Sequence, residues 1–140
     1  MSRPKATLKQ AVELYLIIVG GAYTLSALVA LISNTHWLLT STDRTEVRGF
    51  RSDIGDNSIM LVAAGATLIA GVGIHKYRSW GLVLAAVLGV MAIAESVAAS
   101  AVDPWEYHNF MIGLPMAAIM IWALLPPTWV KFKQRSVRTS

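Results

Sequence analysis

The chain has 140 residues, of which 55% are apolar and only 14% are charged. An average soluble domain is about 45–50% apolar and about 25% charged, so this chain has too few charged groups to cover the surface of an ordinary soluble domain. The same composition excludes disorder. The net charge is +4, and the absence of cysteine excludes disulfides, thiolate metal sites and cysteine nucleophiles. The length fits a single domain, residues 1–140, and the composition indicates an integral membrane protein.

Four apolar segments approach the length of about 20 residues that a helix needs to cross a hydrocarbon core of about 30 Å. They do not alternate between apolar and polar residues, as the strands of a membrane barrel would. The sequence therefore predicts an all-α, up-down bundle of four membrane helices. These cover residues 11–33, 58–75, 81–101 and 109–130, and the last helix runs through Pro126 and Pro127. Pro115 should kink that helix because it removes one backbone hydrogen bond.

The basic residues predict the orientation of the bundle. Because short cytoplasmic segments are enriched in Lys and Arg, we expect both termini in the cytoplasm and the chain in the cytoplasmic (inner or plasma) membrane. The N-terminal apolar run exceeds the about 7–15 residues of a signal-peptide core, so we expect it to be retained as the first span. Basic residues that flank spans also make a nucleic-acid partner unexpected. They lie in the tails (residues 1–10 and 131–140) and after the second helix: Arg3, Lys5, Lys9, Lys76, Arg78, Lys131, Lys133, Arg135 and Arg138.

The connection between the first two helices, residues 34–57, is the longest. Asp43 followed by Glu46 resembles a capping box, and at 100° per residue the side chains of Arg44, Arg48 and Arg51 share one helix face. We predict a short amphipathic helix that lies on the outer membrane surface. Two interpretations remain open: an interfacial strap that covers the bundle, or an arginine stripe that binds anionic lipid or an acidic patch on a partner.

Small residues predict where the helices pack, because helices in lipid associate through close backbone approach. The outward faces, rich in Leu, Ile, Val and Met, are left for lipid or another subunit. The predicted contact residues are Gly21, Ala22, Ser26 and Ala30 on the first helix, Ala63, Thr67 and Gly71 on the second, and Ala85, Gly89, Ala92, Ser96 and Ala99 on the third.

Glu95 is the only charge within the third helix, and it lies roughly 6 Å from the bilayer centre. An ionisable group at that depth costs a few kilocalories per mole. Three interpretations stay open. Glu95 is a neutral clip between helices, hydrogen-bonded by Ser26 or Ser96; it is a relay for protons or cations; or it contacts an Arg or Lys of another subunit.

Glu13 is the one charged residue of the first predicted helix, and it lies near the start of that helix. It follows Lys9 by one helical turn, which predicts a local ion pair. A contact to His75 or Lys76 would explain it equally well.

Two groups of residues at the outer level are candidates for a cofactor. His36 and His108 fall at one level on the first and fourth helices, where a four-helix bundle can hold haem between two histidines; ordinary interfacial histidine is the alternative. Asp103, Glu106 and His108 offer ligands for a divalent ion, but their spacing matches no compact metal motif, and the helix dipole also favours acidic residues there. We expect no cofactor, with haem or a metal as the alternatives.

The chain contains no phosphate loop, dinucleotide fingerprint or serine elbow, so we do not expect an enzyme. The leading hypothesis is an accessory, scaffold or assembly subunit that contacts lipid and packs against other membrane-protein subunits or a second copy. The second is a small oligomeric transporter or channel, coupled to protons or ions through Glu95. The third is a redox subunit that holds haem or quinone near His36 and His108.

Overall fold

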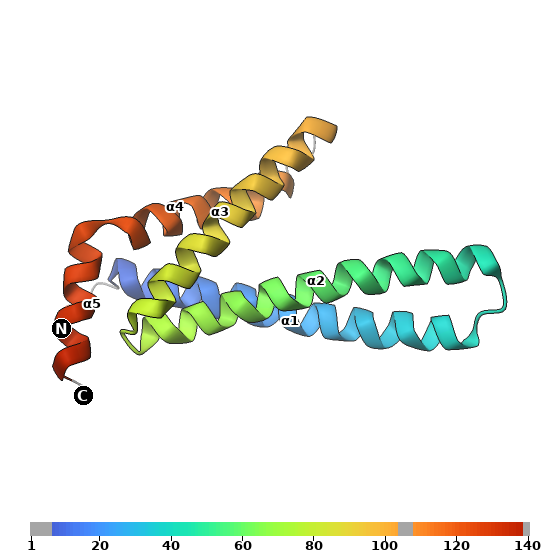
Figure 1. The fold of residues 1–140 in the computed structure, drawn as a ribbon, viewed down its shortest axis with the longest axis horizontal. Helices are drawn as coiled ribbons and strands as arrows, with labels where there is room; N and C mark the ends of the chain where they lie inside the picture. Colours follow the sequence, from blue (N-terminus) through green and yellow to red (C-terminus); the bar gives the residue numbers. More distant parts are fainter. Residues whose placement is uncertain (1–6, 104–107, 139–140) are drawn as a thin grey trace, which may run out of the picture.

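The computed structural model describes residues 7–103 and 108–138, with the backbone alone over residues 108–110. These residues form five helices and two antiparallel hairpins (Figure 1). One hairpin joins α1 to α2, the other joins α3 to α4, and the two meet mainly through α2 and α3. The helices are α1 (Leu8–Thr40), α2 (Arg44–His75), α3 (Ser79–Val102), α4 (His108–Leu124) and α5 (Pro126–Arg138).

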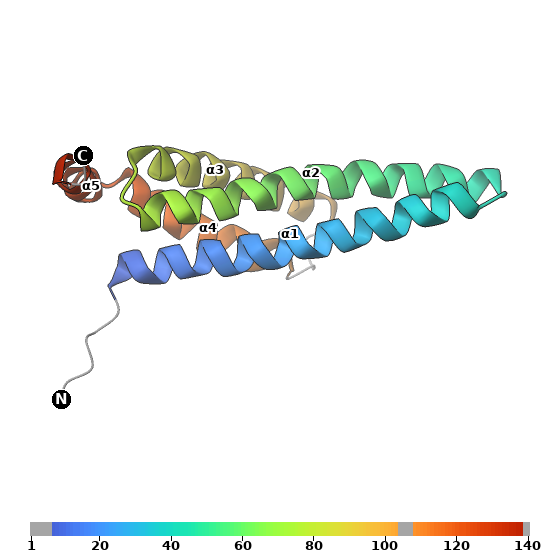
Figure 2. The ribbon, with the colours of Figure 1, turned by 90° about the horizontal axis from the view of Figure 1, so that it is seen from below.

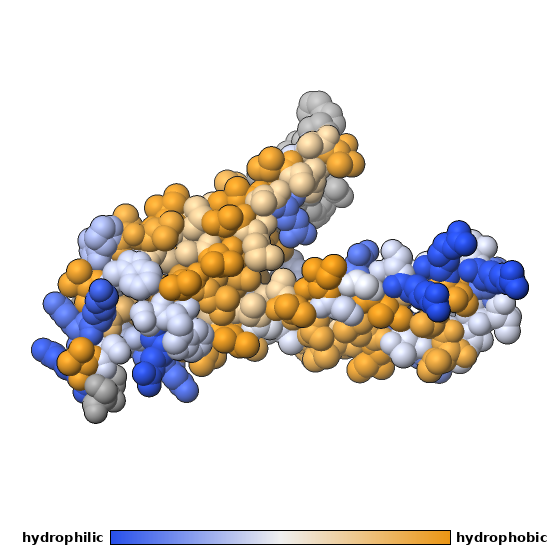
Figure 3. Space-filling model, in the orientation of Figure 1, coloured by the Kyte–Doolittle hydropathy of each residue, from blue (hydrophilic) through white to orange (hydrophobic). Residues whose placement is uncertain are grey.

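The all-helical prediction is confirmed. Three helices, α1, α2 and α3, are long and apolar enough to cross a membrane, and α4 with α5 adds a fourth if that bent pair is one span. Large apolar side chains remain exposed on the outside of these helices, and Figure 3 shows apolar surface along both hairpins. Such an apolar surface suits contact with lipid, because exposed apolar side chains are solvated by lipid chains and not by water in a membrane.

The first connection is much shorter than predicted, and the prediction of a separate amphipathic helix is wrong. Only residues 41–43 join α1 to α2. Arg44, Arg48 and Arg51 are helical as expected, but they lie in the first turns of α2. With 33 and 32 residues, the two helices are each about 50 Å long, whereas the hydrocarbon core is about 30 Å thick. The predicted spans end where the apolar residues end, whereas the two paired helices continue beyond the apolar residues.

Local hydrogen bonds explain how α2 begins. Asp43 is the N-cap and accepts the Thr45 N–H at 2.8 Å. Glu46 does not complete the expected capping box; its carboxylate accepts a hydrogen bond from the Ser41 hydroxyl at 2.7 Å. Farther along, the Asn57 amide donates to the Asp53 carbonyl at 2.7 Å, a side-chain bond that competes with the helix backbone and does not itself stabilise the polar segment.

The fourth predicted helix ends earlier than expected. α4 stops at Leu124, and α5 begins at Pro126 after a bend of 65°. Pro126 has no N–H, so the Trp122 carbonyl loses its usual donor. That carbonyl accepts instead from the Leu125 N–H at 3.3 Å and from the Thr128 hydroxyl at 2.9 Å. Pro115 lies inside α4 as predicted, but the sharp change of direction falls at the proline pair.

The hydrophobic core lies at one end of the molecule, where α1 begins, α2 turns into α3, and α5 packs against α4. Leu16, Ile74, Leu82 and Phe132 are fully buried there and come from four different helices. Away from this core end the two hairpins diverge (Figure 1), and the α1–α2 hairpin extends well beyond α3 and α4 (Figure 2). The packing therefore closes one end of the molecule and leaves a gap that widens toward the hairpin tips.

Small residues make the close contacts predicted on α2 and α3. A Cβ atom built on Gly89 would lie 2.6 Å from the Met120 Cβ atom, so α3 and α4 approach closely there. Gly71 allows a similar close approach of α2 to α1, because a Cβ atom on it would lie 2.8 Å from Cγ1 of Ile17. Ser96 is buried as well, against Gly113 of α4.

On α1 the predicted contact face is wrong by one residue. A Cβ atom on Gly20 would lie 2.5 Å from the Leu68 backbone nitrogen, whereas one on Gly21 would have no atom within 4 Å. Ala22 and Ser26 are exposed. Both glycines fit a stripe of small residues in the sequence. The rotation of α1 about its axis decides that Gly20, and not Gly21, contacts α2.

Candidate functional site

A groove of about 530 Å³ opens between the two hairpins, next to the core. All four of the helices α1–α4 contribute to its wall, which is mainly apolar. Polar groups in the wall come from two carboxylates, one phenol and one hydroxyl. These belong to Asp56, Glu95, Tyr23 and Thr67, and the other lining residues are Val19, Gly20, Ile59, Met60, Ala63, Ala64, Leu88, Met91, Ala92, Ile112 and Met116.

Glu95 and Asp56 are brought to this groove from different hairpins. Glu95 comes from the last third of α3 and Asp56 from the first half of α2, and both side chains are exposed. Within the part of the chain that the structure describes, neither carboxylate makes an ion pair or a side-chain hydrogen bond. Carboxylates within spans face a bundle interior or a cavity and pair with a cation, a proton or a polar group. The groove is the place where such a partner would lie.

The serines predicted to hold Glu95 do not do so. Ser26 is exposed on α1 and is not among the groove residues, and Ser96 is buried against Gly113. Over the described residues, no hydrogen bond joins either serine to Glu95. The Glu95 carboxylate therefore lines the groove without a hydrogen bond from the described residues.

Sequence reasoning missed Asp56, which hydropathy assigns to the polar connection before the second span. The helical spacing of the residues around Asp56 indicates that it belongs to the groove. Asp56, Ile59, Met60 and Ala63 follow at intervals of three, one and three residues and share one face of α2. The same spacing places Glu95 on the groove face of α3. Once the polar segment is known to be helical, Asp56 falls on the groove face of α2.

None of the three arginines lines the groove, although Arg51 lies five residues before Asp56 on α2. Arg44, Arg48 and Arg51 are exposed on α2 near the tip of the α1–α2 hairpin. Figure 3 shows a hydrophilic surface at that tip, beyond the apolar part of the hairpin. They therefore belong to a helical extension past the apolar segment, where they are accessible to lipid headgroups or to a protein.

The two predicted haem histidines belong to different hairpins. His36 is exposed near the end of α1, with its ring centroid 5.9 Å from that of Trp37. His108 opens α4, on the other hairpin, and its side chain lies outside the described residues. Asp103 follows α3 and Glu106 lies outside the described residues. Among residues 7–103 and 108–138, no group of three His, Cys, Asp or Glu side chains is placed to hold a metal ion.

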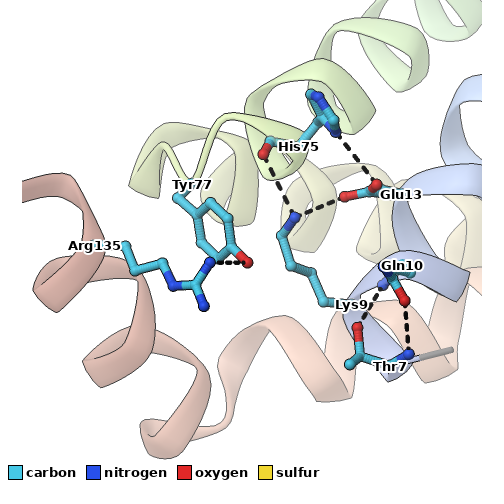
Figure 4. Close-up of polar contacts among 7 residues, drawn as sticks. All are labelled: Thr7, Lys9, Gln10, Glu13, His75, Tyr77 and Arg135. Atoms are coloured by element: carbon cyan, nitrogen blue, oxygen red, sulfur yellow. Dashed lines mark hydrogen bonds and ion pairs between the residues drawn. The ribbon is translucent and has the colours of Figure 1, made fainter. Parts of the chain in front are cut away.

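The ion pair predicted for Glu13 is confirmed at the core end (Figure 4). Lys9 Nζ lies 2.7 Å from Glu13 Oε2, and His75 Nδ1 lies 3.3 Å from Glu13 Oε1. Lys9 also donates to the His75 carbonyl at 3.4 Å. These contacts tie the start of α1 to the end of α2, where a cation is favoured beside the last carbonyl groups of a helix.

α1 also begins three residues before the predicted span, at a capping box that sequence reasoning missed. The Gln10 N–H donates to the Thr7 hydroxyl at 3.4 Å, and the Thr7 N–H donates to the Gln10 side chain at 2.9 Å (Figure 4). The pattern Thr-x-x-Gln in the sequence already predicts this capping box.

Comparisons of this chain with protein-family models, with curated proteins and with solved structures found no match.

Proposed function

We propose that this protein is an accessory subunit of a larger membrane complex, and that the groove between its hairpins receives a transmembrane helix of a partner subunit. The observation that carries the proposal is the pair Glu95 and Asp56, which line one groove and lack a cationic partner in the described part of the chain. Two basic residues on the partner helix, Lys or Arg, would neutralise them, since ionisable groups in lipid pair with one another.

The composition of the groove wall also supports a helix as the occupant. Ala63, Ala64 and Ala92 lie in the wall beside the carboxylates. Small residues let two helix backbones approach closely, and this contact replaces the hydrophobic driving force that lipid does not provide. The exposed apolar side chains outside the groove would contact lipid, which is an apolar solvent, so they do not require a protein partner.

We further propose that the chain crosses the membrane four times, with α4 as the fourth span and both termini in the cytoplasm. Lys9, Lys76, Arg78 and the basic residues of α5 all belong to the core end. The positive-inside tendency then assigns this end to the cytoplasm of a cell with an inner or plasma membrane. A fluorescent or enzymatic reporter fused after α5 tests the orientation, and activity on the outer side of the membrane would contradict it.

The test of the partner helix is a photo-crosslinking experiment on the full-length protein in native membranes. A photoreactive side chain at Met91 faces the groove, and the same group at Val90 is exposed on α3 outside it. We expect Met91 to crosslink to an apolar segment of a partner that contains Lys or Arg, and Val90 to crosslink to lipid. Crosslinks to lipid alone at both positions would contradict the proposal.

Charge removal provides the second part of the test. The double variant Glu95→Gln, Asp56→Asn should lose the partner in a mild-detergent pull-down, because the partner's charge would be left buried and unpaired. Such a loss costs about 2–5 kcal/mol, or roughly 30-fold or more in affinity. Asp53→Asn is the matched control, since Asp53 lies on α2 outside the groove. Equal recovery of the partner with the double variant and the control would contradict the proposal.

A transporter or channel coupled to protons or ions is the second candidate, and one observation favours it. Glu95, Asp56, Tyr23 and Thr67 line the same open groove, so carboxylates and hydroxyl groups from three helices converge on a single space. In that case, purified protein in proteoliposomes would carry a proton or cation flux that Glu95→Gln abolishes and Asp53→Asn preserves. Absence of flux from the wild-type protein would exclude this candidate and leave the accessory subunit.

A further inference from the structure

A second pocket, of about 600 Å³, lies at the core end, between α5 and the start of α1. Four of its lining side chains are basic, three are aromatic, and none of the described residues that line it is acidic. The basic residues come from both helices, and the aromatic rings form the floor between them. They are Lys9, Lys131, Arg135 and Arg138, with Tyr77, Trp122 and Phe132.

Tyr77 organises two of these cations. It has φ of 53° in the turn after α2, a left-handed conformation that is unfavourable for a residue with a Cβ atom. Two backbone hydrogen bonds complete this turn, from the Tyr77 N–H to Ile74 O and from the Arg78 N–H to Gly73 O, in the pattern where glycine is usual. A tyrosine therefore stands at a position where glycine would fit with less strain.

The ring of Tyr77 lies between Lys9 and Arg135. Lys9 Nζ is 4.0 Å from the ring centroid and the Arg135 guanidinium carbon is 4.6 Å from it. Arg135 also donates to the Tyr77 hydroxyl at 2.8 Å (Figure 4). Cation–π contacts offset the repulsion between the two basic groups. Glu13 balances the charge of Lys9, so the net positive charge of the pocket comes from α5.

The amphipathic character of α5 adds a second, independent observation. Thr128 and Phe132 are buried on one side of this helix, while Lys131 and Arg138 are exposed. Phe132 packs against Tyr77 and Trp122, with ring centroids 5.3 Å and 6.3 Å away. After a bend of 65° from α4, α5 has the composition of a basic helix that lies in the lipid headgroup layer.

We propose that this pocket binds the phosphate group of an anionic phospholipid. The arginine guanidinium matches a phosphate through paired N–H donors, and the aromatic floor suits the headgroup level of a membrane. A water-soluble phosphate ester would present the same group, but the position of the pocket beside the membrane helices favours a lipid. The site is separate from the groove and does not depend on the function proposed for it.

The test uses full-length protein in nanodiscs that contain phosphatidylglycerol and phosphatidylcholine, followed by native mass spectrometry of the lipids retained. The variant Lys131→Gln, Arg138→Gln keeps the contact between Arg135 and Tyr77, which protects folding. We expect it to retain phosphatidylglycerol about 100-fold less well, because each charge-assisted hydrogen bond lost to the phosphate contributes a factor of about ten. The charge-matched control Lys133→Gln, Lys76→Gln should bind as the wild type does, since neither residue lines the pocket.

Three results would overturn the proposal. Equal losses in the two double variants would show diffuse attraction to the membrane surface, and equal retention of the two lipids would show no phosphate selectivity. A separate titration with glycerol 3-phosphate distinguishes the sources of phosphate. Tight binding of this soluble ester without selective retention of phosphatidylglycerol would also overturn the assignment to a lipid.

Discussion

Gly20 marks the closest approach of α1 to α2, and replacing it with alanine should destabilise the α1–α2 hairpin. A Cβ atom at this position would lie 2.5 Å from Leu68 N, 2.9 Å from Leu68 Cα and 3.1 Å from the Ala64 carbonyl oxygen. All three are backbone atoms of α2, so no rotamer change relieves the contacts. Restoring ordinary contact requires the helices to separate by roughly 1 Å, and overpacking of this kind costs about 1–3 kcal/mol.

Gly21 supplies the matched control, because a Cβ atom there has no neighbour within 4 Å. Both replacements gain the same helix propensity, up to about 1 kcal/mol, so the two variants should differ by the overpacking cost alone, about 1–3 kcal/mol in free energy of unfolding. Denaturant unfolding of the detergent-solubilised chain, followed by circular dichroism, measures this difference. Equal stability of the two variants would refute the close approach of α1 and α2 at Gly20.

Three further changes test local features of the fold by the same assay. Asp43→Ala should lower the free energy of unfolding by about 1 kcal/mol through loss of the N-cap of α2, while Thr42→Ala in the same connection should not. Tyr77→Gly should be about 1 kcal/mol more stable than Tyr77→Ala, because both remove the ring and only glycine adopts φ of 53° freely; the reverse order would contradict the left-handed turn. Gly113→Ala should clash with the Ser96 side chain and lose stability that Ser96→Ala partly restores, whereas additive effects would argue against their contact.

Features that depend on neighbours in the chain were predictable from the sequence. Lys9 and Glu13 are one helical turn apart and form the expected ion pair, and Asp43 begins a helix as its side chain suggests. Ala85 and Gly89 lie on the predicted packing face of α3 and are buried. The contacts of Lys9 and Asp43 lie within a few residues, and the spacing of small residues defines the packing face of α3, so neither prediction needs knowledge of the facing helix.

Features that depend on where a helix ends were less predictable. Hydropathy places the start of the second span at Ser58, but α2 begins at Arg44 and its polar turns pair with the end of α1. It also carries the fourth span to Val130, where the structure bends by 65° at Pro126. A hydropathy profile measures preference for lipid, whereas a helix ends where its backbone hydrogen bonds end.

The sequence by itself determined that the chain is all-helical and apolar enough to cross a membrane, because the backbone groups of an apolar segment in lipid must be satisfied within that segment. Only the tertiary structure decided that Asp56 joins Glu95 in one groove, that Gly20 and not Gly21 contacts α2, and that Tyr77 orders two cations. Each of these depends on how one helix is rotated and crossed against another. A stripe of small or polar residues defines a face, but the facing helix selects which residue of that face makes the contact.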